Sequence, residues 1–227
     1  MKVISGVAAA GSGSLGRFTW SRNRSGAYIR EKAVPVNPNT VFQQLMRSHF
    51  ANLSTAWLNE LTAVQREAWI AYALAVLLPD ALGNMQSIGG NAMFIKCNAG
   101  RLQAGKTRID SGPVILTLAE LSAVTLTATG ATDALSFGYV NSDLWATAVG
   151  GHLFLFASRP QSPSISSFKG PYRFVAVVNG AVVPPTSPIV VTHSFPFAAG
   201  DKIFFRAVAS NADGRPSPDF RSMTTAV

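Results

Sequence analysis

The side chains that could perform acid–base or metal chemistry in this 227-residue chain are few and scattered. The three histidines, His49, His152 and His193, lie far apart in the sequence, and the eleven acidic residues are separated from one another. The single cysteine, Cys97, is expected to be a small buried residue. Metal sites and catalytic sites need converging side chains, so the sequence predicts no bound metal, no cofactor and no enzyme activity.

One combination of residue types could still make specific contacts, in a glycine-rich segment near the N-terminus. The first 32 residues carry six basic side chains and one acidic side chain. The aromatic and arginine residues among them are Arg17, Trp20, Arg22, Arg24, Tyr28 and Arg30. Bases stack on aromatic rings and phosphates pair with arginine, so these residues could bind single-stranded nucleic acid. An arm that clamps a neighbouring subunit needs fewer assumptions, and we predict that these six residues form an assembly interface.

The segment that carries these residues is predicted to be an extended basic arm, residues 1–39. A polar, glycine-rich chain cannot bury enough apolar surface to order itself, so the arm should need a partner. Two strand-like runs, residues 18–20 and 27–29, flank a turn-like segment and predict a hairpin. Such a hairpin is marginal in water unless a partner surface covers it. The alternative is a solvated tail that its arginines keep soluble.

A helical domain is predicted over residues 40–104. Thr40 with Gln43, and Thr62 with Gln65, have the spacing of capping boxes and predict the starts of two helices that pack as a helical hairpin. A third helix is expected over residues 91–102. The first apolar stripe consists of Phe42, Leu45, Met46, Phe50, Leu53 and Trp57, and the second of Val64, Ala68, Trp69, Tyr72 and Val76.

Residues 105–113 read as a linker, and after Pro113 the apolar period changes to two. The predicted strands cover residues 114–118, 124–129, 134–140, 152–158, 172–179, 189–192 and 202–210. Short strands separated by Gly, Pro, Ser, Asn and Asp predict an antiparallel β-sandwich over residues 114–227. Trp145 is placed in a loop. The predicted fold class is therefore α+β, with an arm and a helical hairpin before a sandwich.

Two resemblances add context to this organisation. The segment FRAVASNADGRPSP, residues 205–218, resembles the closing strand and turn of a fibronectin type III domain, and the resemblance extends over about residues 115–225. It implies an immunoglobulin- or fibronectin III-like sandwich.

Residues 10–100 resemble a group of uncharacterised proteins, many of them phage- or prophage-associated, that have a Gly/Ser-rich basic arm before a helical hairpin. The pattern consists of SGSLG at 12–16, SRNRSGAYIR at 21–30 and PVNPNT at 35–40, then Gln43, Arg47, Trp57, Leu61, Thr62, Gln65, Arg66 and Trp69. This resemblance implies a phage context and no mechanism.

Composition favours an assembled protein. Only 13% of the residues are charged and 48% are hydrophobic, against a typical charged fraction of about 25%. A subunit of a larger assembly can hide such a surface in its interfaces. The longest apolar run, residues 70–78, is too short to span a membrane, and we expect no signal peptide.

These observations predict a non-enzymatic structural subunit of a virion or similar particle, capsid- or tail-associated and assembled in the host cytoplasm. Its partners would be copies of itself and other particle subunits. The first alternative is a surface or carbohydrate recognition module that uses the sandwich loops. The second is a nucleic-acid-binding protein that uses the basic arm.

Overall fold

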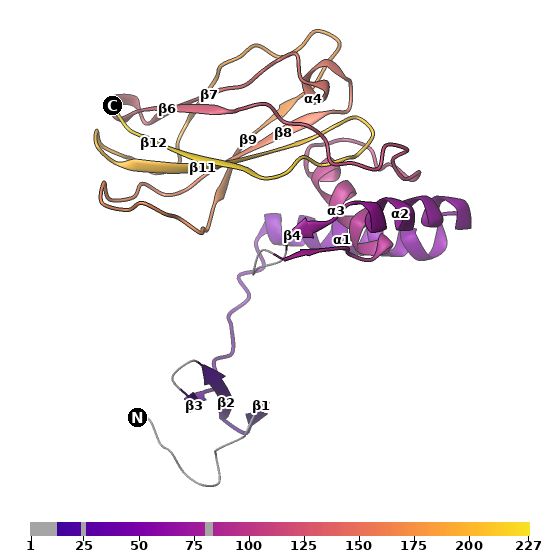
Figure 1. Ribbon diagram of the computed structural model, residues 1–227. Helices are drawn as coiled ribbons and strands as arrows, with labels where there is room; N and C mark the ends of the chain where they lie inside the picture. Colours follow the sequence, from indigo (N-terminus) through magenta and orange to yellow (C-terminus); the bar gives the residue numbers. More distant parts are fainter. Residues whose placement is uncertain (1–12, 24–25, 80–83) are drawn as a thin grey trace. The chain divides into compact units, whose positions relative to one another are not determined.

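The computed structural model describes residues 13–23, 26–79 and 84–227 (Figure 1). The chain divides into two compact units, residues 1–43 and residues 44–227. Helices and antiparallel sheets follow one another along the sequence, so the fold class is α+β, as predicted.

The first unit contains a small antiparallel sheet with the order β1-β2-β3. Its strands are β1 (Gly13–Leu15), β2 (Phe18–Asn23) and β3 (Gly26–Glu31). Strands β2 and β3 confirm the predicted pairing, with Trp20 opposite Ile29. The turn residues 24 and 25 lie outside the described residues. Strand β1 was not predicted; it joins β2 through a tight turn at Gly16, whose φ of 58° favours glycine.

The capping boxes start their helices as predicted. Helix α1 (Val41–Asn59) follows Thr40, whose Oγ1 accepts from the backbone N–H of Gln43 at 3.3 Å, while the Thr40 N–H donates to Gln43 Oε1 at 3.2 Å. Helix α2 (Ala63–Ala75) has the same reciprocal pair at Thr62 and Gln65. These bonds satisfy backbone N–H groups that have no partner inside a helix.

Helix α3 (Gly90–Gln103) is the main packing partner of α2. The short strands β4 (Leu78–Pro79) and β5 (Met85–Gln86) pair with each other and lie between α2 and α3 in the sequence. The Trp69 ring is fully buried and meets Phe94 of α3 edge-on, with 5.5 Å between ring centroids. Trp69 and Tyr72 are therefore core residues, as predicted.

The predicted apolar stripe of α1 is wrong for half of its residues. Leu53 is buried, but Phe42, Leu45 and Phe50 are exposed. On α2, Val64 is also exposed rather than buried. The reason is tertiary: α3 rather than α1 supplies most of the surface against which α2 packs.

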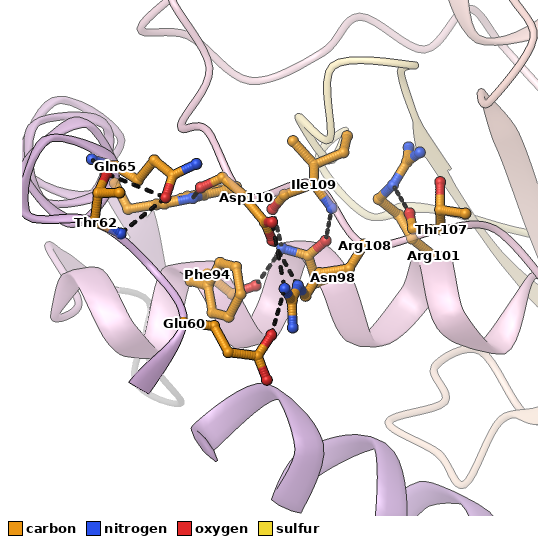
Figure 2. Close-up of polar contacts among 11 residues, drawn as sticks. Glu60, Thr62, Gln65, Phe94, Asn98, Arg101, Thr107, Arg108, Ile109 and Asp110 are labelled. Carbon is orange, nitrogen blue, oxygen red and sulfur yellow. Dashed lines mark hydrogen bonds and ion pairs between the residues drawn. The ribbon is translucent and has the colours of Figure 1, made fainter. Parts of the chain in front are cut away.

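Residues 105–113 contain no helix or strand, and hydrogen bonds and ion pairs connect them to the helical segment (Figure 2). The Asn98 side chain bonds to Ile109 in both directions, accepting from its N–H at 2.7 Å and donating to its carbonyl oxygen at 3.1 Å. Trp69 Nε1 donates to the carbonyl oxygen of Asp110 at 2.8 Å. Arg108 forms ion pairs with Asp110 and with Glu60, which follows α1. This segment is therefore part of the packed structure of the second unit.

Residues 114–227, all of them described, form two antiparallel sheets. The strands are β6 (Thr125–Thr129), β7 (Ala134–Gly138), β8 (His152–Ala157), β9 (Arg173–Asn179), β10 (Ile189–Thr192), β11 (Lys202–Ser210) and β12 (Phe220–Thr225). Their orders are β10-β7-β6 and β12-β11-β8-β9. Both sheets contribute to one hydrophobic core, in which Phe137 of β7 meets Phe205 of β11 edge-on with 5.9 Å between ring centroids.

Six of the seven predicted strands are confirmed, and one is wrong. Residues 114–118 are not a strand; the carbonyl oxygen of Thr117 accepts instead from Tyr72 Oη and from Arg215 Nη1, both at 3.4 Å. Strand β12, the seventh of the two sheets, was not predicted; it lies at a sheet edge and pairs with β11 alone among the described strands. Trp145 was placed in a loop but lies in the short helix α4 (Leu144–Thr147), fully buried in the core.

Within the described ranges, no helix combines the length and the apolar character that crossing a membrane requires.

Candidate assembly interface

The small sheet of the first unit has one apolar face and one polar face. Side chains alternate along a strand, and residues paired across strands share a face. Leu15 pairs with Phe18, and Trp20 pairs with Ile29, which places all four on the same face. Glu31 also pairs with Phe18, so one carboxylate borders this mainly apolar face. Ser14 pairs with Thr19, and Ser21 pairs with Tyr28, on the opposite face. The sheet is amphipathic although its composition is polar and glycine-rich.

The apolar face of the arm sheet is largely open to solvent. Leu15 is 74% exposed and Phe18 is 55% exposed; Ile29 is exposed too, and Trp20 is half-buried. Strands β1 and β3 each pair with β2 alone among the described strands, so neither outer edge of the sheet has a partner in the described part of the chain. An uncovered apolar face beside open edges is the surface that a protein partner would cover.

The six residues predicted for this interface do not all lie on the apolar face. Trp20 is on it, whereas Tyr28 and Arg30 lie on the polar face. Arg17, in the turn before β2, donates from Nη2 to Glu31 Oε1 at 3.1 Å. Arg22 belongs to β2, and Arg24 lies outside the described residues. Leu15, Phe18 and Ile29 were not among the predicted interface residues. The alternation of apolar and polar residues at 18–21 was a signal for Phe18, whereas Leu15 and Ile29 follow from the strand pairing.

Further exposed apolar side chains lie on the helices of the second unit. Phe50 of α1 is 58% exposed, and Leu74 of α2 is 65% exposed. A cavity of about 330 Å³ beside Phe50 is lined mainly by apolar atoms of α1 and α3. Exposed apolar side chains thus occur in both compact units, on the arm sheet and on the helices, as the low fraction of charged residues would lead us to expect.

Arg101 is the most deeply buried cation of the helical segment. Its Nε donates to the carbonyl oxygen of Thr107 at 3.1 Å, and its Nη1 donates to that of Gly150 at 3.0 Å. Nη1 also reaches the carbonyl oxygens of Asn211 and Ala212 at 3.4 and 3.3 Å. Burial lowers its pKa, while the charge of Asp213 opposes that shift. The site is structural: it joins α3 to the loops at one end of the two sheets.

The other candidate chemical residues occupy unreactive environments. Burial raises the pKa of Cys97 to about 12, which keeps the thiol protonated. Burial and the nearby charge of Arg101 lower the pKa of His152 to about 4, so this imidazole is neutral near pH 7. His193 is buried in a loop, with a backbone carbonyl oxygen facing each ring nitrogen. His49 lies on α1, so the structure does not bring the three histidines together.

The described residues also contain no group of three or more His, Cys, Asp or Glu side chains placed to hold a metal ion. The arm sheet therefore remains the strongest candidate site of the chain. No family model, no curated protein and no solved structure matches this sequence or this fold.

Proposed function

We propose that this protein is a non-enzymatic structural subunit of a virion or a similar multi-subunit particle, assembled through its N-terminal arm. One observation carries the proposal: the mainly apolar face of the arm sheet, formed by Leu15, Phe18, Trp20 and Ile29, is largely exposed in the described part of the single chain. A three-stranded sheet with an exposed apolar face gains stability when a second surface covers it. The partners proposed are other copies of this chain and other subunits of the particle.

The second unit supports the same proposal because it does not depend on the arm. Both hydrophobic cores consist of residues from Leu53 onward, and none of the described arm residues belongs to either core. The arm can therefore leave its own chain and pack on a neighbour without opening a core. Arms of this kind join subunits by strand addition or by covering an apolar surface.

For residues 114–227 we propose an immunoglobulin- or fibronectin III-like sandwich, displayed by the assembled particle. Seven antiparallel strands are divided three and four between two sheets that share a core. The chain crosses between the sheets after β7, after β9 and after β10, as it does in sandwiches with Greek-key connections. A superposition of an experimental structure on such domains would test this topology.

The virion context of the proposal comes from the resemblance of residues 10–100 to phage-associated proteins. Mass spectrometry of particles purified from a lysed host culture tests it directly. The proposal requires the chain to be present in these particles in fixed stoichiometry to their other subunits, and its absence from them would contradict the virion context.

The two faces of the arm sheet offer a matched test of the assembly mechanism. Trp20→Ala and Phe18→Ser remove apolar surface from the uncovered face, whereas Tyr28→Ala removes a comparable ring from the polar face. Sedimentation of the full chain should show weaker association for the first two variants and near-normal association for Tyr28→Ala, because aromatic anchors dominate interfaces. Equal effects on both faces would contradict a mechanism based on the apolar face.

A further inference from the structure

A small pocket lies in the connection between β8 and β9 of the second unit. It has a volume of about 240 Å³ and is lined by Arg159, Gln161, Phe168, Pro171 and Arg173. The first four residues belong to the segment between β8 and β9, and Arg173 begins β9. Two cations therefore line a concavity that contains no acidic residue.

The two guanidinium groups share one aromatic ring. The Cζ atoms of Arg159 and Arg173 lie 4.6 and 5.1 Å from the centroid of the Phe195 ring. Among the described residues, neither arginine forms an ion pair with a carboxylate, whereas Arg206 and Arg221 are both paired with Asp219. Two cations that line one pocket without a carboxylate partner favour an anionic ligand.

The walls of the pocket are fixed by bonds to the sheet. The Phe168 ring stacks on Phe204 of β11, with 5.4 Å between centroids, and Tyr172 Oη donates to the Phe168 carbonyl oxygen at 3.2 Å. The backbone of Gln161 pairs with Lys202, which lies at the start of β11, in both directions at 2.9 Å. A pre-formed site loses less entropy when its ligand binds.

The Phe195 ring that both arginines contact is fixed as well. Buried His193 lies within hydrogen-bond distance of the carbonyl oxygens of Phe195, at 2.8 Å from Nδ1, and of Ser158, at 3.1 Å from Nε2. Ser158 directly precedes Arg159, so one imidazole holds the loop that carries the ring and the loop that carries a guanidinium.

We infer that this pocket binds a carboxylate-bearing sugar residue. Arginine forks match the planar geometry of a carboxylate, and Phe168 and Pro171 offer apolar surface to the C–H face of a sugar ring. Gln161 Nε2 donates to the backbone oxygens of Arg159 and Pro160, both at 3.0 Å, which leaves Oε1 to accept from a sugar hydroxyl. The volume of the pocket is below the roughly 300–1,000 Å³ that is typical of sites for larger ligands, so the pocket suits a single sugar residue at the end of a glycan.

The site goes beyond the proposed assembly function, because it gives the displayed sandwich a ligand of defined chemistry. A phosphate group would satisfy the arginines but has no hydroxyl on a ring to donate to Gln161 Oε1. We therefore expect the pocket to distinguish an acidic sugar both from a neutral sugar and from a simple anion.

Ligand-observed NMR titration of the full chain tests this inference with four probes. D-Glucuronic acid and N-acetylneuraminic acid carry the carboxylate, D-glucose lacks it, and inorganic phosphate supplies charge alone. At least one acidic sugar should bind, at least ten-fold more tightly than glucose or phosphate. Binding of phosphate as tight as that of both acidic sugars would overturn the inference, and so would the absence of binding by both acidic sugars.

Variants then locate the binding. Arg159→Gln with Arg173→Gln should weaken acidic-sugar binding at least ten-fold without changing the mass of the assembly. Phe195→Leu, which removes the shared ring but no charge, should give a smaller loss. Arg66→Gln on α2 is the matched control and should leave binding unchanged. Unaltered binding by the double variant, with an unchanged melting temperature to show that it folds, would place the sugar elsewhere and overturn the assignment.

Discussion

Arg101 of α3 donates from Nη1 to the carbonyl oxygen of Gly150, 3.0 Å away, just before strand β8. The same nitrogen reaches the carbonyl oxygens of Asn211 and Ala212, which follow β11. One buried cation thus connects a helix with two loops of the sheets through backbone oxygens. Helices and sheets of the second unit are coupled at this point, so damage here should affect both.

The first prediction concerns this junction. Arg101→Ala removes every bond from the guanidinium and leaves several carbonyl oxygens without their donor, so the free energy of unfolding should fall by about 3–5 kcal/mol. Arg101→Lys keeps the charge but loses the planar fork, so its loss of unfolding free energy should lie between zero and that of Arg101→Ala. Urea unfolding followed by far-UV circular dichroism measures both. A loss under about 1 kcal/mol for the alanine variant would show that the junction adds little.

The second prediction compares two tryptophans. Trp69 is fully buried and donates to the carbonyl oxygen of Asp110, whereas Trp57 is half-buried beside Phe94. Trp69→Ala should cost about 3–5 kcal/mol, and Trp57→Ala should cost clearly less, because part of its ring is already in contact with water. Urea midpoints of the two variants, compared at equal m-value, check the order. The reverse order would contradict the packing described for α2.

The third prediction is a pH dependence of stability. The pKa of His152 is lowered from 6.5 to about 4, first by burial and second by the charge of Arg101. Between these two values the unfolded chain binds a proton that the folded chain does not, so stability is retained above pH 6.5 and lost as the pH falls toward 4. The shift corresponds to a loss on the order of 3 kcal/mol.

The measurement is the free energy of unfolding of the natural chain and of His152→Gln from pH 7 to pH 4. Carboxylates titrate in both proteins, so the difference between the two curves isolates the histidine. This difference should shrink as the pH falls, because the natural chain loses the stability that its neutral imidazole retained. A constant difference over this range would contradict the lowered pKa.

The fourth prediction distinguishes two roles of the arm, subunit assembly and nucleic-acid binding. Arg17 already forms an ion pair with Glu31, so one cation of the arm is partly neutralised. If the arm covers a protein surface, binding of a single-stranded oligonucleotide should be weak at about 0.15 M salt. Tight binding that falls steeply with salt, and whose slope flattens for Arg22→Glu with Arg30→Glu, would favour the nucleic-acid alternative.

Much of the local structure could be predicted because its signals are short in range. The capping boxes at Thr40 and Thr62 each act over three residues, and the strands follow a period of two. The fate of an apolar side chain depends on its tertiary neighbours, which is why Phe50 was expected in the core and lies exposed. Trp145 was misplaced for the same reason: its four-residue helix has no periodicity, and only the core around it explains its burial.

The candidate sites could likewise be predicted only where their residues lie close together in the sequence. Trp20 could be predicted from the aromatic and basic residues near it, and its neighbours on the apolar face follow once the strand pairing is known. Arg159 and Arg173 lie at the two ends of the connection between β8 and β9, whereas Phe195 lies between β10 and β11, and the three meet only in the folded structure. No spacing rule connects them, so that pocket could not have been predicted from the sequence.

The central claim is that the arm drives assembly, and the molar mass of the full chain compared with that of residues 35–227 tests it most directly. The shorter chain keeps the cap at Thr40 and both hydrophobic cores, so it should fold. Size-exclusion chromatography with light scattering, at matched concentration, should give a multiple of 24.0 kDa for the full chain and a monomer for the shorter one. A shorter chain that assembles to the same order as the full chain would contradict the account.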